Sequence, residues 1–503
     1  MNKPAYILAF ILLINCFGHA AQSQTVNKKE AIDNIFSKYH EYDGFQGSVL
    51  VAEKGNVLYK NAFGLANREW NIPNEVDSRF DIASISKQFT AMLVMQLVEE
   101  GKIHLDSTIS TYYPEYRQDT GNKVSIHHLL THRSGIPNYT SIPYVWSDSL
   151  VNHYSSDELA RRFCSGDLEF EPGSRYSYNN SGYFLLSIIL EKVSGVSFER
   201  LLQEKILSPA GMSNSGIDSR LRILNKRAYG YVRELENYEN ARPLYMANLQ
   251  GAGNMYSTVE DLYLWDRALH SNKLLSRRGK KTMTTAYSDS SDTWITPYSN
   301  TYGYGIGLTK VPGSRGGEVS MEFHSGHITG YSSFMARFVE DEHVVIILSN
   351  TGNVSTARMN EITQEVRKVL SNQAYQVPER SMRTALYDII QEQSVQAAID
   401  HFYHLRESFP YDYENTEEEL HALGIDLLAD GKKVEAKAIF ELNVKVNPSW
   451  LSYQSLGDVY HELENLERAS YYYKQSMQVN PKETEEEINA FKASERALST
   501  LSQ

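Results

Sequence analysis

The feature that most restricts how this chain can fold is a pattern near its C-terminus that recurs at an offset of 33 residues. The matching positions are Leu423-Gly424, Ala436, Phe440 and Pro448 in one copy, and Leu456-Gly457, Ala469, Tyr473 and Pro481 in the next. Self-similarity at this period is typical of stacked helical hairpins, in which each unit buries its apolar face against its neighbours. The small residues would let paired helices approach, and the aromatic rings would fill the gaps between them. The pattern predicts an all-α array beyond about residue 380.

The residues and their spacing resemble tetratricopeptide repeats, with Tyr453 and Tyr460 at the aromatic positions of the second copy. Residues that repeat the second half of the pattern once more are Ala398, Phe402 and Pro410. They imply a degenerate first hairpin, and residues 484–498 are expected to form a capping helix. An unrelated bundle of α-hairpins is the alternative. We assign residues 376–503 to tetratricopeptide-like helical repeats, which would offer a surface to a protein partner.

Upstream of the repeats, strand patterns lie at both ends of a long, helix-rich segment. Alternating apolar and polar side chains predict strands over residues 47–52 and 57–63. Two later segments, residues 332–338 and 343–348, are predicted as strands separated by a polar turn, and helical periodicity predicts a helix over residues 89–105. The turn signal Glu53-Lys54-Gly55-Asn56 joins the first two strands as a β-hairpin. Strands that bracket helices favour a sheet with helices on its faces, an α+β or α/β domain. We place this domain at residues 24–375.

Residues 1–23 have the layout of a secretory signal peptide. Lys3 precedes an apolar run over residues 5–14, and small and polar residues follow, with cleavage expected after Ser23. The run is shorter than the roughly 20 residues that a membrane-spanning helix needs, and no later segment predicts a transmembrane helix. The residues before Cys16 loosely resemble a lipoprotein site, but Asn15 stands where a small residue is expected. We therefore expect export to the periplasm or beyond the cell rather than lipid anchoring at Cys16.

Charge and composition exclude several functions. The net charge of -13, from 49 basic and 62 acidic residues, gives no electrostatic reason to expect a nucleic-acid partner. His127 and His128 are adjacent and would face apart, and the sequence has neither a His-Glu-x-x-His motif nor a paired-cysteine site. We expect no metal and no cofactor.

The segment Ser84-Ile85-Ser86-Lys87 lies at the start of the predicted helix. Ser84 and Lys87 are three residues apart and would share one helical face, so a nucleophile and an amine would be neighbours. A helix N-terminus also presents free N–H groups, which favour the oxyanion that forms when a serine attacks a carbonyl. Taken alone, the motif is equally explained by a capping serine and a solvated lysine.

Two further motifs follow in order, Tyr178-Asn179-Asn180 and His324-Ser325-Gly326. Together with Ser84–Lys87 they resemble the serine β-lactamase and D-alanyl-D-alanine peptidase superfamily, in its class C β-lactamase-related branch with S-x-x-K, Y-x-N and H-x-G. Supporting stretches are residues 129–137, 251–253 and 257–261. The resemblance covers residues 30–370 and implies a β-lactamase/transpeptidase-like fold, an α/β sandwich with an antiparallel sheet flanked by helices.

The resemblance also implies roles for the motif residues. Ser84 would form an acyl-enzyme, and either Lys87 or Tyr178 would take its proton. Both side chains have reference pKa values near 10, so the environment must shift one of them, and the sequence leaves open which. Asn180 would donate its amide to the substrate and orient Lys87. The backbone N–H groups of Ser84 and His327 would form the oxyanion hole, and Gly326 would let the substrate backbone lie against the strand.

Alternative interpretations remain open for each motif. Tyr178 is also explained as a packed aromatic residue and Asn180 as a helix cap. Ser177 and Asn179 fit the S-x-N pattern of other branches. His324 is also explained as a structural histidine, and His132 is expected to support a turn.

The motifs favour a metal-independent serine hydrolase that acts on ester, amide or D-amino-acid peptide substrates. Every expected position is filled, whereas a non-catalytic scaffold or sensor that binds partners through its repeats would be expected to lose Ser84, Lys87 or Tyr178. Relatives that grip a substrate carboxylate carry lysine where this chain has His324. A histidine is mostly neutral at pH 7 and offers one N–H donor, which favours substrates without a carboxylate there and argues against an efficient β-lactamase.

Overall fold

The structure is a computed structural model. It describes residues 27–43, 45–142, 144–219, 221–234, 237–288, 301–313, 316–352, 354, 356–377, 382–408, 416–482 and 485–501. The predicted signal peptide over residues 1–23, with Cys16, lies outside the described residues, and so does Pro410.

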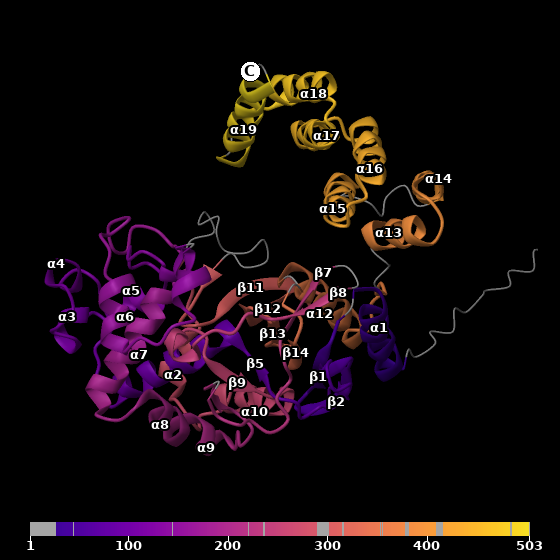
Figure 1. Cartoon of the computed structure of the whole chain (residues 1–503). Helices are drawn as coiled ribbons and strands as arrows, with labels where there is room; N and C mark the ends of the chain where they lie inside the picture. The colour runs from indigo at the N-terminus through magenta and orange to yellow at the C-terminus, as the bar shows by residue number, and fades with distance from the viewer. Residues whose placement is uncertain are drawn as a thin grey trace, which may run out of the picture.

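A seven-stranded antiparallel sheet runs through the centre of the first 377 residues (Figure 1), in the order β10-β11-β12-β13-β14-β1-β2. Its strands are β1 (Gly47–Glu53), β2 (Asn56–Phe63), β10 (Thr301–Tyr302), β11 (Gly307–Pro312), β12 (Glu318–Ile328), β13 (Tyr331–Phe338) and β14 (His343–Ser349). β1 pairs with β14 from Gly47 opposite Ser349 to Glu53 opposite His343. The sheet therefore joins the two ends of this part of the chain.

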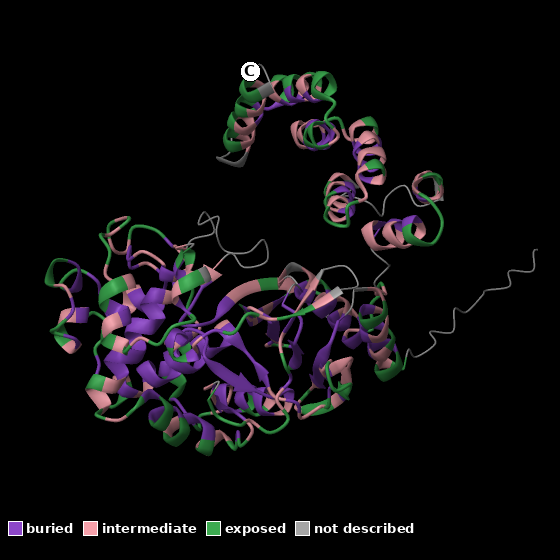
Figure 2. Cartoon of the chain, in the orientation of Figure 1, coloured by how far each residue is buried: buried purple, intermediate pink, exposed green. Residues whose placement is uncertain are grey.

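Alternating side chains of the central strands enter two different apolar cores. On β1, Val49 and Val51 pack beneath α1 (Lys28–Asp43) and α12 (Thr356–Leu370). The intervening Leu50 and Ala52 join the larger core on the opposite face. That core includes residues of α2 (Ser86–Glu99), α7 (Asn180–Ser194) and α10 (Val259–Leu269). The period of two along a strand thus produces a helix–sheet–helix sandwich whose interior is buried throughout (Figure 2).

The remaining elements of this part are short. The helices are η1 (Ala83–Ile85), α3 (Ile109–Tyr112), α4 (Gln118–Gly121), α5 (Ile126–Leu130), η2 (Tyr139–Ser141), η3 (Val145–Ser149), α6 (Ser156–Phe163), α8 (Phe198–Leu202), η4 (Gln203–Leu207), α9 (Ser208–Ala210), η5 (Met246–Leu249) and α11 (Arg277–Met283). The strands are β3 (Leu65–Asn67), β4 (Ile72–Pro73), β5 (Phe80–Asp81), β6 (Gly216–Ile217), β7 (Tyr231–Glu234), β8 (Asn237–Asn240) and β9 (Met255–Ser257).

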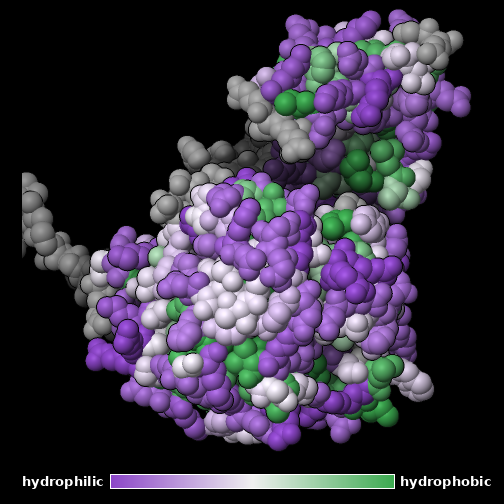
Figure 3. Space-filling model, turned by 90° about the vertical axis from the view of Figure 1, so that its left-hand side faces the viewer, coloured by the Kyte–Doolittle hydropathy of each residue, from purple (hydrophilic) through white to green (hydrophobic). Residues whose placement is uncertain are grey.

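The outer face near α3–α7 is mainly hydrophilic, with small scattered hydrophobic patches (Figure 3). In the described part of the chain, no single helix has both the length and the apolar character needed to cross a membrane. One pair bent by 82°, residues 180–194 with 198–210, passes that test together, by length and composition alone.

The α+β fold and the four predicted strands are confirmed, as β1, β2, β13 and β14. The predicted helix over residues 89–105 corresponds to α2, which begins and ends earlier. Gly101 has a left-handed backbone with φ of 69°, which stops the helix. The motif His324-Ser325-Gly326 lies inside a strand that was not predicted, β12, which directly precedes the predicted strand β13. On β12, Val319, Met321 and Phe323 are buried beneath α1 and α12, whereas the opposite face carries Glu322, His324 and Gly326 before Ile328, so no continuous apolar run marks the strand.

Residues beyond 382 form an all-helical array, as predicted. Its helices are α13 (Met382–Glu392), α14 (Val395–Ser408), α15 (Thr416–Ala429), α16 (Lys433–Val446), α17 (Trp450–Glu462), α18 (Leu466–Val479) and α19 (Glu485–Leu501). A side-chain carbon added at Gly424 would lie 2.3 Å from the Phe440 ring, and one added at Gly457 would lie 2.8 Å from the Tyr473 ring. The same contact between glycine and ring thus recurs at the 33-residue offset, and it supports a repeated hairpin unit.

We expect the sheet-containing part to fold without the helical array. The apolar core of the array draws on residues from Met382 onward, whereas the two cores around the sheet end at Tyr375. A chain ending at Tyr375 should therefore show a cooperative thermal transition within about 2 °C of one seen in the full chain, measured by scanning calorimetry. Loss of that transition, or a decrease of more than about 5 °C, would show that the array is needed for folding.

Candidate active site

Ser84 lies in η1, directly before α2, and is half-buried. The segment before it is anchored because β5 pairs with β9 and the Ile82 N–H donates to the Met255 carbonyl at 2.9 Å. Ala83 has a left-handed backbone with φ of 45°, a conformation that costs a non-glycine residue on the order of 1 kcal/mol or more. Such strain is maintained where the surrounding structure fixes the neighbouring residue, which here is Ser84.

Lys87 is the centre of the site, and it is 0% exposed. Its Nζ lies 3.0 Å from Ser84 Oγ, 2.7 Å from Asn180 Oδ1 and 2.8 Å from the Ala252 carbonyl oxygen. Burial lowers the pKa of this amine well below its ordinary value. A neutral amine has two N–H donors, which the amide and carbonyl oxygens can accept, and a lone pair that remains for the Ser84 hydroxyl. The arrangement can therefore remove a proton from Ser84.

The two asparagines after Tyr178 have different positions. Asn180 reaches Lys87 with Oδ1 and donates through Nδ2 to Thr140 Oγ1 at 2.7 Å. Asn179 is the N-cap of α7, where Oδ1 accepts from the Gly182 N–H at 2.8 Å. The capping role that was an alternative for Asn180 therefore belongs to its neighbour. Of the two reading frames left open by the sequence, this geometry favours the one with Tyr178 and Asn180 in the site.

Tyr178 lies beside both Lys87 and Ser84. The Lys87 Nζ is 4.9 Å from the centre of its ring, and the Ser84 side chain lies close enough to lower the pKa of its hydroxyl. Burial has the larger effect and raises the pKa of the Tyr178 hydroxyl. Tyr178 is therefore a protonated phenol at neutral pH, and it is suited to donate a proton.

His324 is buried, and both of its ring nitrogens have partners. Nδ1 lies 2.5 Å from the Ser325 carbonyl oxygen, and Nε2 lies 2.8 Å from the Tyr302 hydroxyl. A carbonyl can only accept, so Nδ1 carries the hydrogen and Nε2 accepts from Tyr302. Burial lowers the pKa of His324 to about 3, which keeps the ring neutral. The N–H donor expected to face the substrate is instead bound to the protein's own carbonyl.

Gly326 is required by packing inside the protein. A side-chain carbon at this position would lie 2.2 Å from the Ile82 carbonyl oxygen and 2.3 Å from Ser333 Oγ. The sequence interpretation attributed this glycine to a passing substrate, whereas the structure fills the space with the segment that leads to Ser84. Because Gly326 has no side chain, the backbone of β12 at Gly326 and at the next residue, His327, can lie against the segment that leads to Ser84. The His327 side chain itself is exposed.

The sequence interpretation missed residues that complete the site. Tyr302 fixes His324, Thr140 accepts from Asn180, and the Asn138 side chain accepts from the Asn180 N–H at 3.0 Å. None belongs to a motif, so the sequence carries no signal for them. Ala252 lies within the supporting stretch 251–253, but its contribution is a carbonyl oxygen, which no side-chain pattern can reveal.

Comparisons with known proteins agree with this geometry. The family model described as Beta-lactamase matches residues 32–368. Penicillin-binding protein 4* of Bacillus subtilis is 32% identical over 370 residues, covering 70% of this chain and 78% of its own length. The D-aminopeptidase of Gluconobacter oxydans is 28% identical over 356 residues, covering 69% of this chain and 63% of its own. The crystal structure of penicillin binding protein from Bacillus halodurans has 28% identity and a TM-score of 0.57, covering 66% of this chain and 98% of its own.

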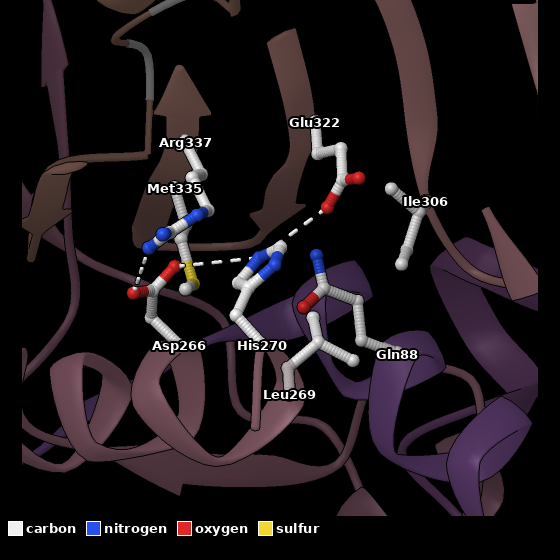
Figure 4. Close-up of a pocket in the computed structure, with 8 residues that line it drawn as sticks. All are labelled: Gln88, Asp266, Leu269, His270, Ile306, Glu322, Met335 and Arg337. Carbon is white, nitrogen blue, oxygen red and sulfur yellow. Dashed lines mark hydrogen bonds and ion pairs between the residues drawn. The ribbon is translucent and has the colours of Figure 1, made fainter. Parts of the chain in front are cut away.

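A charged cluster lies behind the site, on the same face of β12 as His324 (Figure 4). His270 sits between Asp266 and Glu322, with Nε2 3.7 Å from Asp266 Oδ1 and 3.3 Å from Glu322 Oε2. Arg337 on β13 pairs with Asp266 at 2.6 Å. Burial raises the pKa of Glu322 to about 7 and that of Asp266 to about 6, and it lowers the pKa of His270 to about 3.

These shifts predict how stability depends on pH. Glu322 binds a proton more tightly in the folded chain, so the stability it contributes is fully present below its unfolded pKa of about 4.5 and is lost as pH rises through 7. Glu322→Gln should remove this loss. Between pH 5 and 8 the unfolding free energy of the wild type should fall by about 2 kcal/mol relative to the variant, measured by urea denaturation.

The matched control is Glu318→Gln, because Glu318 lies on the same strand with its side chain 67% exposed. This change should leave the pH dependence as in the wild type. Parallel stability curves for wild type and Glu322→Gln would contradict the prediction.

Proposed function

This chain belongs to the β-lactamase family and is a serine hydrolase of that family, and from this premise we propose that Ser84 forms an acyl-enzyme with ester, amide or D-amino-acid peptide substrates. The observation that carries the proposal is the buried Lys87 amine, held 3.0 Å from Ser84 Oγ by two further oxygen partners. A serine hydroxyl becomes an effective nucleophile when an adjacent base removes its proton.

The reaction divides into two steps. In the first, Lys87 accepts the Ser84 proton while Oγ attacks the substrate carbonyl carbon, and the resulting oxyanion binds the N–H groups of Ser84 and His327. Tyr178 then donates its proton to the leaving oxygen or nitrogen, and the ammonium of Lys87 beside it transfers the Ser84 proton to the Tyr178 phenolate, which restores the phenol and the neutral amine. In the second step water attacks the acyl carbon, and the Lys87–Tyr178 pair takes the water proton and returns a proton to Ser84.

The environment of His324 bears on the substrate. A neutral ring with both nitrogens already bonded has no positive charge and no spare donor for a carboxylate. This supports substrates that carry no carboxylate at that point. The relatives named penicillin-binding protein and D-aminopeptidase support substrates whose leaving group is an amine or a lactam nitrogen. We therefore favour short esters and amides over penicillins.

The proposal includes the location and the domain organisation. Residues 1–23 would direct export to the periplasm or the outside, residues 24–375 would form the hydrolase domain, and residues 376–503 would form tetratricopeptide-like repeats that bind a protein partner. The competing proposal is a scaffold or sensor that has lost catalysis. Lys87 argues against it, because burying an amine is unfavourable and has no evident use in a protein that performs no proton transfer.

The first functional prediction concerns Ser84→Ala. The variant should lose covalent labelling by a fluorophosphonate and at least about 10⁴-fold of kcat/KM on a short ester, because the bond-forming oxygen is gone. Its unfolding free energy should change by about 1 kcal/mol or less. Intact-protein mass spectrometry measures the labelling.

Ser177→Ala is the matched control, since Ser177 lies next to Tyr178 and belongs to the other reading frame. This variant should label like the wild type. A folded Ser84→Ala protein that still labels and turns over would refute the assignment of the nucleophile.

The second functional prediction concerns substrate class. The wild type should hydrolyse a nitrophenyl ester with a higher kcat/KM than a cephalosporin, because neutral His324 cannot pair with the cephalosporin carboxylate. His324→Lys should lower KM for the cephalosporin by about 10-fold, as expected for one added charge pair. Steady-state kinetics on both substrates, with melting curves as a folding control, test this. A wild type that prefers the cephalosporin would show that this interpretation of His324 is wrong.

A further inference from the structure

The His132 ring is fully buried in a group of tyrosines beside the site. The distances from its ring centre to theirs are 4.3 Å for Tyr178, 4.8 Å for Tyr302, 5.1 Å for Tyr183 and 5.8 Å for Tyr176. The ring nearest to His132 is therefore that of the proposed proton donor.

His132 also bonds the residues on both sides of Tyr178. Its carbonyl oxygen accepts from the Ser177 N–H at 2.8 Å, and its Nδ1 accepts from the Asn179 N–H at 3.0 Å. One residue thus fixes the backbone before and after Tyr178 and packs against the ring between them.

The arrangement carries a cost that ordinary core packing would avoid. His132 has a left-handed backbone with φ of 58°, and its Nε2 is buried with no hydrogen-bond partner among the described residues. Since Nδ1 accepts a hydrogen bond, a neutral ring must carry its hydrogen on Nε2, where this donor is unsatisfied. An apolar side chain would avoid the unsatisfied donor, but it could not accept the Asn179 N–H. Burial lowers the pKa of His132 well below its ordinary value, so Nδ1 stays an acceptor at neutral pH.

We propose that His132 is a positioning residue, which holds the Tyr178 hydroxyl in place for proton donation to the leaving group. The proposal rests on the function proposed above and adds to it the reason why this part of the chain carries histidine. It assigns His132 a role that extends beyond support of a turn. A displacement of about 1 Å at a reacting group can cost on the order of 100-fold in rate, so the placement of one ring is sufficient to control turnover.

The test compares two esters of the same acyl group. Ethyl butyrate has a poor leaving group that needs a proton, whereas nitrophenyl butyrate has a good leaving group that does not. His132→Gly keeps the left-handed backbone and removes both the acceptor and the ring. It should lower kcat/KM, which reports acylation and not the deacylation step that the two esters share, at least 30-fold on ethyl butyrate and less than 5-fold on nitrophenyl butyrate.

His132→Asn is the conservative variant, because its Oδ1 can replace Nδ1 as acceptor and asparagine tolerates a left-handed backbone. It should keep at least a third of the wild-type kcat/KM on ethyl butyrate. In a Tyr178→Phe background, His132→Gly should cause less than a 3-fold further loss, because a residue that acts through Tyr178 has no effect once the hydroxyl is gone. If His132→Gly does not fold by circular dichroism, His132→Leu replaces it, since leucine matches asparagine in shape and lacks the acceptor.

A general structural role predicts different results. Equal losses on both esters, or a loss in the Tyr178→Phe background as large as in the wild type, would overturn the proposal. Fluorophosphonate labelling of the wild type separates this failure from a failure of the proposed function. A wild type that does not label refutes both proposals, whereas one that labels but shows no dependence on the leaving group refutes the role of His132 alone.

Discussion

The burial of one amine, that of Lys87, is the constraint on which the rest of the site depends. An amine removed from water must find hydrogen-bond partners in the protein, and its partners come from three separate segments: Ser84 on η1, Asn180 on α7 and Ala252 in the loop before β9. Each segment is fixed by its own packing, so the position of the nitrogen is determined by the fold as a whole. The same burial that requires these partners also lowers the pKa of the amine, and this links the stability of the core to the chemistry of the serine.

The opposite wall of the site follows a different principle, because its polar groups are bonded to one another. His324 and Tyr302 satisfy each other, and the ring of Tyr302 also packs against His132. Both ring nitrogens of His324 are bonded within the protein, so this wall presents a neutral surface, and the substrate preference proposed above rests on that neutrality. Behind this wall, away from the serine, lie the carboxyl groups of Glu322 and Asp266. His270 lies between these two groups, and Arg337 forms an ion pair with Asp266. Neighbouring positions on one face of β12, Glu322 and His324, therefore lie in different electrostatic environments.

Much of the fold and the motif residues of the site could be predicted from the sequence. β1 and β2 were predicted because apolar and polar residues alternate along them around a turn, β13 and β14 because two apolar segments flank a polar turn, and the helical array because its pattern repeats. β12 was not predicted, although its Val319, Met321 and Phe323 alternate with polar residues and are buried in the core beneath α1 and α12, because the opposite face carries Glu322, His324 and Gly326 in place of apolar residues. Tyr302 and the Ala252 carbonyl could not be predicted, since they reach the site through tertiary packing between segments distant in the sequence. The reason for Gly326 also required coordinates, because the atom that excludes a side chain is the carbonyl of Ile82.

The pairing of β1 with β14 has a consequence for how the chain folds during synthesis. A ribosome releases the hairpin of β1 and β2 early, but the partner strand emerges only after nearly the whole domain has been made. Closing so long a loop costs chain entropy before any contact compensates for it, so high contact order makes such a sheet slow to form. An unfinished polypeptide would carry the serine and lysine without β12 and β13, the strands that contact η1, and its exposed hairpin edge would be open to wrong pairing. The helical array is made last, when the sheet can already be complete.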